Sequence, residues 1–326
     1  MRLSVLIPIY NEVENIPLLC DAVLGVLDTL PHQAEVILVN DGSSDGSGEA
    51  LERAAASDSR LRIIHFRRNY GQTAALMAAI DHASGDILVP MDGDLQNDPA
   101  DIPRLLAKLD EGYDVVSGWR RNRQDKAVTR KLPSRIANWL ISKISGVELH
   151  DYGCTLKAYR RDMLENVRLY GEMHRFVPIY AAWEGARITE MEVNHNPRRF
   201  GVSKYGLGRV AKVILDLVLI RFMQKAFDRP IHFFGTIGLA AVALAMVAGT
   251  WALALKLLEG ISLIATPLPL LAVFLMLTGI LCVLLGVLAE LQMRVYFESQ
   301  AKRNYVIRRL INLEQGSAGA REPELA

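Results

Sequence analysis

The amino-acid sequence predicts an α/β domain with a mainly parallel sheet, followed by an amphipathic helix and two membrane-spanning helices. In the first part of the chain, short apolar runs rich in β-branched residues alternate with segments of helical spacing, which is typical of βαβ units. In the second part, residues 231–255 and 260–289 contain no Asp, Glu, Lys or Arg. Each of these stretches exceeds the roughly 20 residues that cross a bilayer core.

The α/β domain is expected to span residues 1–205. Its apolar runs predict strands, and the apolar spacing between them predicts helices. The predicted strands are 3–9, 35–39, 61–66, 87–91 and 114–117, and the predicted helices are 16–30, 48–56, 73–83 and 102–109. Open sheets of this kind bind ligands outside the carboxyl ends of their strands.

Residues 206–229 predict an amphipathic juxtamembrane helix. Charged residues interrupt its apolar run, among them Lys212, Asp216, Arg221 and Lys225. Such a helix is expected to lie in the headgroup plane with its apolar face down, and packing onto the globular domain is the other interpretation. The apolar pattern of residues 230–290 predicts a two-helix transmembrane hairpin. The alternative interpretation is two buried helices in the core of a large soluble protein.

Lys and Arg residues flank the hairpin on its outer sides, and this predicts its orientation because such residues stay on the cytoplasmic side. They are Arg221, Lys225 and Arg229 before the first span, and Arg294, Lys302, Arg303, Arg308 and Arg309 after the second. We therefore expect a multi-pass protein of the plasma (inner) membrane, with the α/β domain and both termini cytoplasmic. Residues 291–326 are expected to form a basic cytoplasmic tail with a disordered end.

Composition excludes several classes of protein. The formal net charge of +1 gives no general attraction to nucleic acid, so no nucleic-acid partner is expected. The cysteines, Cys20, Cys154 and Cys282, are too scattered for a disulfide framework or a metal cluster, which is consistent with a reducing compartment. The glycine-rich motifs of P-loop ATPases and dinucleotide oxidoreductases are absent.

Two carboxylates at the end of the fourth predicted strand carry the strongest functional signal. Asp92 and Asp94 directly follow an apolar strand, where packing does not explain them, and Gln96 adds an amide oxygen. Oxygen ligands of this kind suit Mg²⁺ or Mn²⁺ rather than zinc. A protein-bound Mg²⁺ usually completes its shell with phosphate oxygens. The loop therefore predicts a metal-held phosphate ligand.

Polar loops also follow the first and second predicted strands. Pro8-Ile9-Tyr10-Asn11-Glu12 suggests a ligand loop at the carboxyl edge of the sheet, although Asn11 and Glu12 could also simply begin the next helix. The segment 40–46, Asn-Asp-Gly-Ser-Ser-Asp-Gly, is explained equally well as a turn and a helix N-cap. In the functional interpretation, Asp41 accepts hydrogen bonds from a base or a ribose.

Two basic segments suit phosphate ligands because the planar fork of arginine donates two parallel hydrogen bonds. The first, 119–135, has one acid, Asp125, against seven cationic residues: Arg120, Arg121, Arg123, Lys126, Arg130, Lys131 and Arg135. A solvated helix face is the alternative for this segment. The second is the glycine-containing loop 197–205. Two cationic segments beside a carboxylate pair would fit two phosphorylated ligands.

At this point five motifs, in order, resemble the family-2 glycosyltransferases of GT-A fold, and more closely the branch of dolichyl-phosphate mannosyltransferases and bacterial polyprenyl-phosphate glycosyltransferases. The resemblance covers about residues 3–310. The motifs are Pro8-Ile9-Tyr10-Asn11-Glu12, Asp41-Gly42-Ser43-Ser44-Asp45, Arg68-Asn69-Tyr70-Gly71-Gln72, Asp92-Gly93-Asp94-Leu95-Gln96 with Pro99, and Gly201-Val202-Ser203-Lys204-Tyr205.

The resemblance implies a role for each matched position. Nucleotide-sugar binding would fall to Pro8, Tyr10, Asn11, Glu12, Asp41, Gln72, Asp92, Arg199 and Lys204. A metal would be organised by Asp92, Asp94 and Gln96, and the catalytic group would comprise Asp94, Arg120, Arg130 and Ser134, the last three gripping an acceptor phosphate. The chain has Asn40 where many relatives have aspartate, which is expected to adjust nucleoside contacts.

The implied reaction moves a sugar from a UDP- or GDP-linked donor to polyprenyl (undecaprenyl) phosphate with inversion, in cell-envelope glycan or lipopolysaccharide modification. Mg²⁺ or Mn²⁺ is the expected cofactor, and the lipid bilayer is an expected partner. The exposed spans are also compatible with a homo-oligomer. The sugar stays open among glucose, mannose, a hexosamine and an aminoarabinose derivative. A processive polysaccharide synthase and a non-enzymatic membrane-tethered nucleotide-binding assembly factor are the alternative functions.

Overall fold

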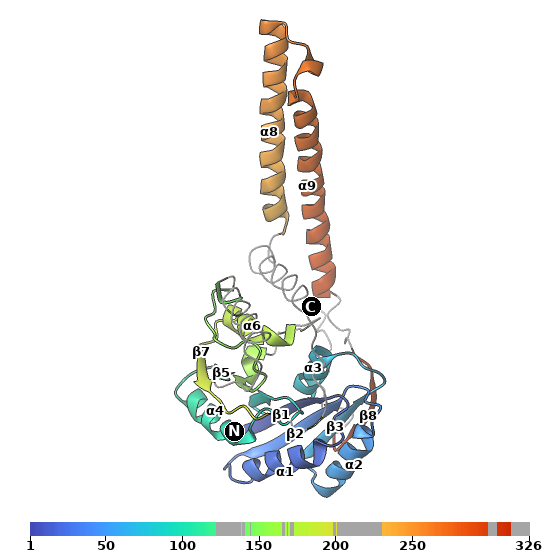
Figure 1. Ribbon diagram of the computed structural model, residues 1–326, viewed down its shortest axis with the longest axis vertical. Helices are drawn as coiled ribbons and strands as arrows, with labels where there is room; N and C mark the ends of the chain where they lie inside the picture. Colours follow the sequence, from blue (N-terminus) through green and yellow to red (C-terminus); the bar gives the residue numbers. More distant parts are fainter. Residues whose placement is uncertain are drawn as a thin grey trace, which may run out of the picture. The chain divides into compact units, whose positions relative to one another are not determined.

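The computed structural model describes residues 1–121, 138, 141–143, 145–164, 167, 169, 173–197, 200, 230–298 and 305–313. The chain forms two compact units (Figure 1). The first combines Met1–Leu217 with Arg303–Ala326, and the second is Val218–Lys302. The predicted amphipathic helix 206–229 lies outside the described residues.

An eight-stranded sheet organises the first unit, in the order β7-β5-β6-β4-β1-β2-β3-β8 among the described residues. Its strands are β1 Arg2–Ile9, β2 Gln33–Asn40, β3 Leu61–Phe66, β4 Ile87–Pro90, β5 Val115–Trp119, β6 Lys157–Arg160, β7 Ile188–Glu192 and β8 Ile307–Ile311. Strand β6 is antiparallel to β4 and β5, and β8 is antiparallel to β3, while the other pairs are parallel. The predicted α/β fold with a mainly parallel sheet is confirmed.

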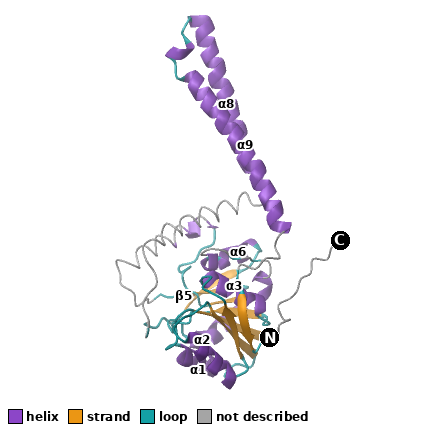
Figure 2. Cartoon of the chain, turned by 90° about the vertical axis from the view of Figure 1, so that its right-hand side faces the viewer, coloured by secondary structure: helices purple, strands orange, loops and turns teal. Residues whose placement is uncertain are grey.

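Helices cover both faces of this sheet (Figure 2). They are α1 Ile16–Leu27, α2 Ser47–Ser57, α3 Gln72–His82, α4 Ile102–Asp110 and α6 Val177–Trp183, with short 3-10 turns at Pro99–Asp101, Arg161–Leu164 and Met173–Arg175. Helices α1 and α2 lie on one face and α3 on the other.

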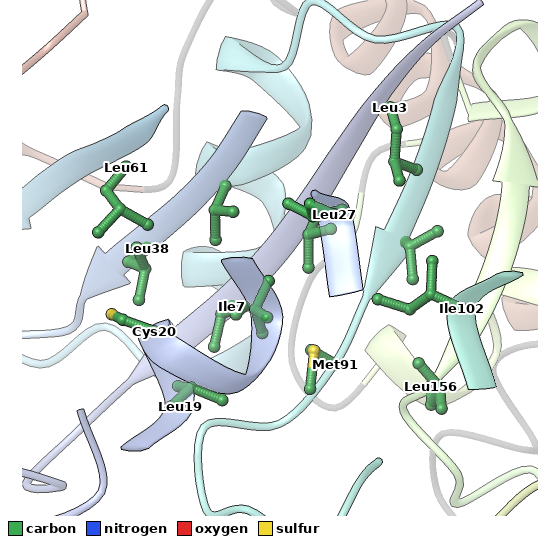
Figure 3. Packing of buried hydrophobic residues seen from close by; sticks show 14 of the residues in the cluster. Leu3, Ile7, Leu19, Cys20, Leu27, Leu38, Leu61, Met91, Ile102 and Leu156 are labelled. Carbon is green, nitrogen blue, oxygen red and sulfur yellow. The ribbon is translucent and has the colours of Figure 1, made fainter. Parts of the chain in front are cut away.

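Alternation along β1 builds the core on the α1 side. Every second residue of β1 is buried against α1, whose own buried residues recur at helical spacing (Figure 3). The buried residues of this layer include Leu3, Val5, Ile7 and Ile9 from β1, and Ile16, Leu19, Cys20, Val23 and Leu27 from α1. Because this core holds β1 against α1, it also fixes the position of the loop that follows β1.

The strand order brings the carboxyl ends of β1, β2 and β4 together at one edge of the sheet. From β1 the chain moves to β2 and β3 on one side, and then returns to place β4 on the other side. In the register, Ile9 of β1 lies beside Asn40 of β2, and Leu6 lies beside Pro90 of β4. The loops after these strands therefore meet at a topological switch point, where open α/β sheets bind ligands.

Part of the predicted tail 291–326 forms regular structure among the described residues. The helix after residue 290 continues to Glu298, and Ile307–Ile311 forms edge strand β8 against β3. The strand is short and has Arg308 and Arg309 near its centre. These charges interrupt the apolar pattern that would predict a strand. Pairing with β3 satisfies its backbone groups, which is why an otherwise unremarkable run becomes a strand.

The second unit contains α8 Pro230–Glu259 and α9 Leu268–Glu298, joined through a short turn at Leu263–Ala265. Both helices are long and apolar enough to cross a membrane, over Phe233–Glu259 and Leu268–Ala289. They approach closely at Gly238 and Gly279, because a Cβ on Gly238 would stand 2.7 Å from the Gly279 carbonyl oxygen. Small residues permit this kind of helix contact in membranes.

Candidate active site

The loop after β4 carries Asp92 and Asp94 at the switch point, as the sequence predicts. The two oxygens of Asp92 accept hydrogen bonds from Gln72 Nε2 and Thr155 Oγ1, each at 2.8 Å. Asp94 is buried, and its Oδ1 accepts a hydrogen bond from the Gln96 amide at 3.1 Å. The loop thus presents two carboxylates in fixed orientations, which is the preorganisation that binding a charged ligand requires.

Close packing fixes the path of this loop. A Cβ on Gly93 would stand 2.5 Å from Ile9 Cδ1 and 3.3 Å from the Pro8 carbonyl oxygen, so a larger residue here would displace the Ile9 side chain and crowd the end of β1. Leu95 adopts a φ of 62°, which is unusual for a residue with a side chain. Backbone in such conformations clusters at ligand sites.

Hydrogen bonds connect the loops after β1 and β2. The Asn11 amide donates to Ser43 Oγ at 3.0 Å, and the Ser44 amide donates to Asn11 Oδ1 at 2.9 Å. The Glu12 amide donates to Ser47 Oγ at 2.9 Å. Asn11 therefore organises the loop pair in addition to any contact with a ligand.

The other residues predicted on the β1 loop lie at the same edge. Pro8 is half-buried near the end of β1, and Tyr10 is exposed directly after it. The Glu12 carboxylate accepts a hydrogen bond from Asn15 Nδ2 at 2.5 Å. The structure thus brings the predicted residues of this loop beside those that follow β2 and β4.

Asp41 is buried and holds the loop between β3 and α3. Its Oδ1 accepts the Tyr70 amide at 2.6 Å, and its Oδ2 accepts the Gly71 amide at 2.9 Å. Burial raises the pKa of Asp41, and these two backbone hydrogen bonds partly offset that rise. Each carboxylate oxygen keeps a second lone pair, so Asp41 orders the loop and can still accept a ligand hydrogen bond.

Asn40 lies within the strand layer and contacts other protein groups. Its Nδ2 is 3.1 Å from His65 Nδ1, and its Oδ1 accepts the Ser43 amide at 2.9 Å. Because an amide nitrogen only donates, His65 Nδ1 must accept, which leaves the proton of the neutral ring on Nε2. Burial lowers the pKa of His65, favouring this neutral form. An aspartate at position 40 would lack the donor.

Arg120, predicted to grip an acceptor phosphate, forms a buried ion pair with Asp151. Its Nε and Nη2 donate to the two oxygens of Asp151 at 2.7 and 3.0 Å. Burial would lower the pKa of Arg120, but the charge and hydrogen bonds of Asp151, together with the nearby Cys154 and Asp92, outweigh it and raise the pKa. The guanidinium is therefore held in one orientation at the end of β5, and Asp92 is close enough to contribute to the same rise.

The segment Asp151–Thr155 is the part of the site that the sequence analysis missed. Asp151 orients Arg120, and Thr155 orients Asp92, so one short segment serves both charged groups. Lys157 is buried behind it and donates to the backbone carbonyls of Tyr152 and Cys154. Burial lowers the pKa of Lys157. In the sequence, Asp151 and Thr155 are only two polar residues before a short strand. Their spacing matches no motif, so the sequence alone did not identify them.

The start of the second basic loop lies against the Asp92–Gln96 loop. The Asn196 amide donates to the Gln96 carbonyl oxygen at 2.9 Å, and Asn97 pairs with His195 in an isolated bridge. Loop 197–205 therefore begins beside the carboxylate pair. Arg199 and Lys204 of this loop lie outside the described residues, as do Arg130 and Ser134 of the first basic segment.

The donor set could hold a divalent cation. Asp92, Asp94 and Gln96 offer hard oxygens on a single loop. In the part of the chain that the structure describes, no group of three or more His, Cys, Asp or Glu side chains is placed to hold an ion. A cation held by these three side chains would take further ligands from a bound phosphate or from water, as Mg²⁺ commonly does.

Comparison with known proteins agrees with this geometry. The sequence matches Glycosyl transferase family 2 over residues 4–168. It is 42% identical over 316 residues to a dodecaprenyl-phosphate galacturonate synthase from Rhizobium johnstonii, covering 96% of this chain and 94% of the relative. It is 38% identical to an undecaprenyl-phosphate 4-deoxy-4-formamido-L-arabinose transferase from Yersinia pestis, covering 96% and 95%.

Solved structures share the fold. Glucosyl-3-phosphoglycerate synthase from Mycobacterium tuberculosis, solved with Mn²⁺ and UDP-glucose, superposes with a TM-score of 0.53 at 20% identity. The superposition covers 68% of this chain and 78% of that chain. The chain belongs to glycosyl transferase family 2, and the protein is a glycosyltransferase.

Proposed function

We propose that this protein transfers a sugar from a nucleotide-diphosphate donor to the phosphate of a polyprenol. The observation that carries the proposal is the Asp92–Asp94 pair at the switch point, facing the same edge as the loops after β1 and β2. Two relatives similar over nearly the full chain are named for sugar transfer to a polyprenyl phosphate. The similarity includes the region of the two apolar helices, which a soluble acceptor would not require.

A divalent metal fits the donor end of this site. The carboxylates of Asp92 and Asp94 and the amide of Gln96 would hold Mg²⁺ or Mn²⁺, whose charge would stabilise the departing diphosphate. Gln72 and Thr155 fix the Asp92 oxygens before the ligand arrives. Because Asp41 holds the neighbouring loop through Tyr70 and Gly71, the nucleoside side of the site is ordered by the same network.

The acceptor needs no dedicated base. The second pKa of a phosphate monoester is about 6, so its attacking oxygen is largely ionised at neutral pH. The protein then has to bind and orient this anion, and Arg120, whose guanidinium Asp151 holds in one orientation, would do so. Arg130 and Ser134 would complete the acceptor side, and Arg199 and Lys204 the donor diphosphate side.

The two apolar helices account for how a lipid acceptor is reached. A polyprenyl phosphate keeps its chain in the bilayer and its phosphate at the surface, so the enzyme must be anchored there. We propose a plasma-membrane location with the catalytic unit on the cytoplasmic side, based on the Lys and Arg residues outside the spans.

The product distinguishes this proposal from its alternatives. Membranes containing the protein are incubated with radiolabelled UDP- and GDP-sugars, and lipid and polymer fractions are counted. Label in an organic-extractable lipid that is released by mild acid is the expected result. Label retained on a long polymer would indicate a processive synthase, and binding of nucleotide without any labelled product would indicate a non-enzymatic assembly factor.

A further inference from the structure

Strand β8 contacts the loop that organises the nucleotide side of the site. The ladder between β3 and β8 continues past the end of β3, because the Arg67 amide donates to the Val306 carbonyl oxygen at 3.1 Å. We call residues Arg67–Gly71 the β3–α3 loop. Its first residue is hydrogen-bonded to the residue that precedes β8. This contact joins a segment that follows α9 to a loop of the N-terminal half.

Tyr305, just before β8, packs against the two elements that flank this loop. It is 5% exposed, and its ring stacks on Phe66 with centroids 5.1 Å apart and planes at 18°. Its hydroxyl donates to Asp81 Oδ2 of α3 at 2.7 Å. Tyr305 thus spans from the end of β3 to α3, the two elements between which the β3–α3 loop runs.

Aromatic contacts continue from Tyr305 into the loop. Phe66 meets Tyr70 edge to face at 5.5 Å, and Arg68 lies over the Tyr70 ring at 4.7 Å. The backbone of Tyr70 then donates to Asp41, and the loop passes directly into Gln72, which donates to Asp92. The packing is tight, since a Cβ on Gly42 would stand 2.4 Å from the Arg68 carbonyl carbon.

We propose that Tyr305 is a positioning residue for donor binding, acting through the β3–α3 loop on Asp41 and Asp92. A buried aromatic ring that stacks on Phe66 restricts where Tyr70 can lie. Loss of the ring leaves a cavity beside Phe66, the ring that Tyr70 packs against, and the two amides that bind Asp41 then lose their fixed positions. The acceptor side is held by the Asp151–Arg120 pair, whereas the contacts described above for Tyr305 are with Phe66 and Asp81.

The test compares three variants of the full-length protein in detergent. Tyr305→Ala removes the ring, Tyr305→Phe keeps the stacking and removes only the hydroxyl, and Arg308→Ala changes an exposed residue of β8 as the matched control. Amide hydrogen exchange at Tyr70 and Gly71 is the first measurement. Exchange should be faster in Tyr305→Ala, near that of the wild type in Tyr305→Phe, and unchanged in Arg308→Ala.

The second measurement is kinetic. Unlike the exchange measurement, it depends on the proposed function. Tyr305→Ala should raise the donor KM by about tenfold while leaving the KM for undecaprenyl phosphate unchanged, and Tyr305→Phe should restore most of the donor affinity. Unaltered exchange at Tyr70 and Gly71 in Tyr305→Ala would overturn the inference, as would an equal rise in both KM values. If the wild type transfers nothing to the lipid phosphate, the proposed function fails while the exchange result still decides the role of Tyr305.

Discussion

At the scale of single residues, the site depends on oxygens that are fixed before any ligand binds. Asp92 receives one hydrogen bond from α3 through Gln72 and another from the segment before β6 through Thr155. Asp94 is buried beside it. In a reaction where negative charge grows on a leaving diphosphate, charges already in position do not have to reorganise, and this is the usual source of rate enhancement at such sites.

Asp94→Ala should abolish most of the turnover. Loss of one contact to a reacting phosphate costs about 3 kcal/mol, or roughly a hundredfold in rate. The measurement is the initial rate at saturating donor with Mn²⁺ or Mg²⁺ in excess. Asp110→Ala, which removes an exposed carboxylate at the end of α4, is the control and should keep full activity. Near-normal turnover of Asp94→Ala would contradict the proposal that Asp94 helps to hold the metal ion.

Thr155→Val should lower kcat/KM for the donor by about tenfold, because it removes a hydrogen bond to a charged group without changing the size of the side chain. Thr155→Ser keeps the hydroxyl and should recover much of the activity. Initial rates over a range of donor concentrations make the comparison. If the valine and serine variants were equally active, Thr155 would not orient Asp92.

The residue scale also shows what a sequence can and cannot predict about a site. Asp92 and Asp94 follow an apolar strand, where two carboxylates have no packing explanation, so the pattern identifies them. Thr155 reaches Asp92 across 63 positions of sequence, and a lone threonine has no pattern. Arg120 was predicted as a cation for phosphate, but its partner Asp151 emerges only from the fold.

At the scale of elements, the sequence predicts β1 to β5 but not β6, β7 or β8. Strands β1 to β3 are buried and rich in β-branched residues, so their apolar runs predict them directly. Strands β6 and β7 have four and five residues and contain Lys157, Arg160 and Glu190, which interrupt any apolar pattern. Short strands beside an existing sheet form because the neighbouring strand supplies hydrogen bonds, and that information is not local.

Strand β8 should be essential to the fold of the catalytic unit. A chain ending at Lys302 loses β8, the buried Tyr305 ring and the Asn312 side chain that donates to the Ala55 and Leu61 carbonyls. Loss of a buried aromatic ring alone costs about 3 kcal/mol. Thermal unfolding in detergent should show a marked fall in stability, or the shortened protein should fail to accumulate.

A chain ending at Leu313 is the matched control for this truncation, because it keeps β8 and Asn312. It should unfold at the temperature of the full chain and keep its transferase activity. Equal stability of the chains ending at 302 and 313 would return residues 303–313 to the role of a dispensable tail.

At the scale of the whole molecule, the unit with the two apolar helices is inserted into the sequence of the α/β unit. The α/β unit is left before α8 and rejoined after α9, when β8 completes the sheet. A pair of membrane-spanning helices inserted in this way brings both of its outer ends back to the same unit, so an even number of spans is required. The two candidate spans satisfy that requirement.

This topology predicts which residues face the cytoplasm. Ser262 lies between the two spans and Ser59 lies on the α/β unit, and both are exposed. Ser262→Cys should react with a membrane-impermeant maleimide added to intact cells, whereas Ser59→Cys should react only after permeabilisation. The opposite labelling pattern would contradict the proposed orientation.

The central claim is that the acceptor nucleophile is a lipid phosphate, and one comparison tests it most directly. The purified full-length protein, with Mn²⁺ or Mg²⁺ and a panel of labelled UDP- and GDP-sugars, is offered either undecaprenyl phosphate or undecaprenol, which has the same chain without the phosphate. The account predicts a mild-acid-labile labelled lipid from undecaprenyl phosphate with at least one donor, and none from undecaprenol. Equal labelling of both lipids, or no labelling of undecaprenyl phosphate with any donor, would contradict it.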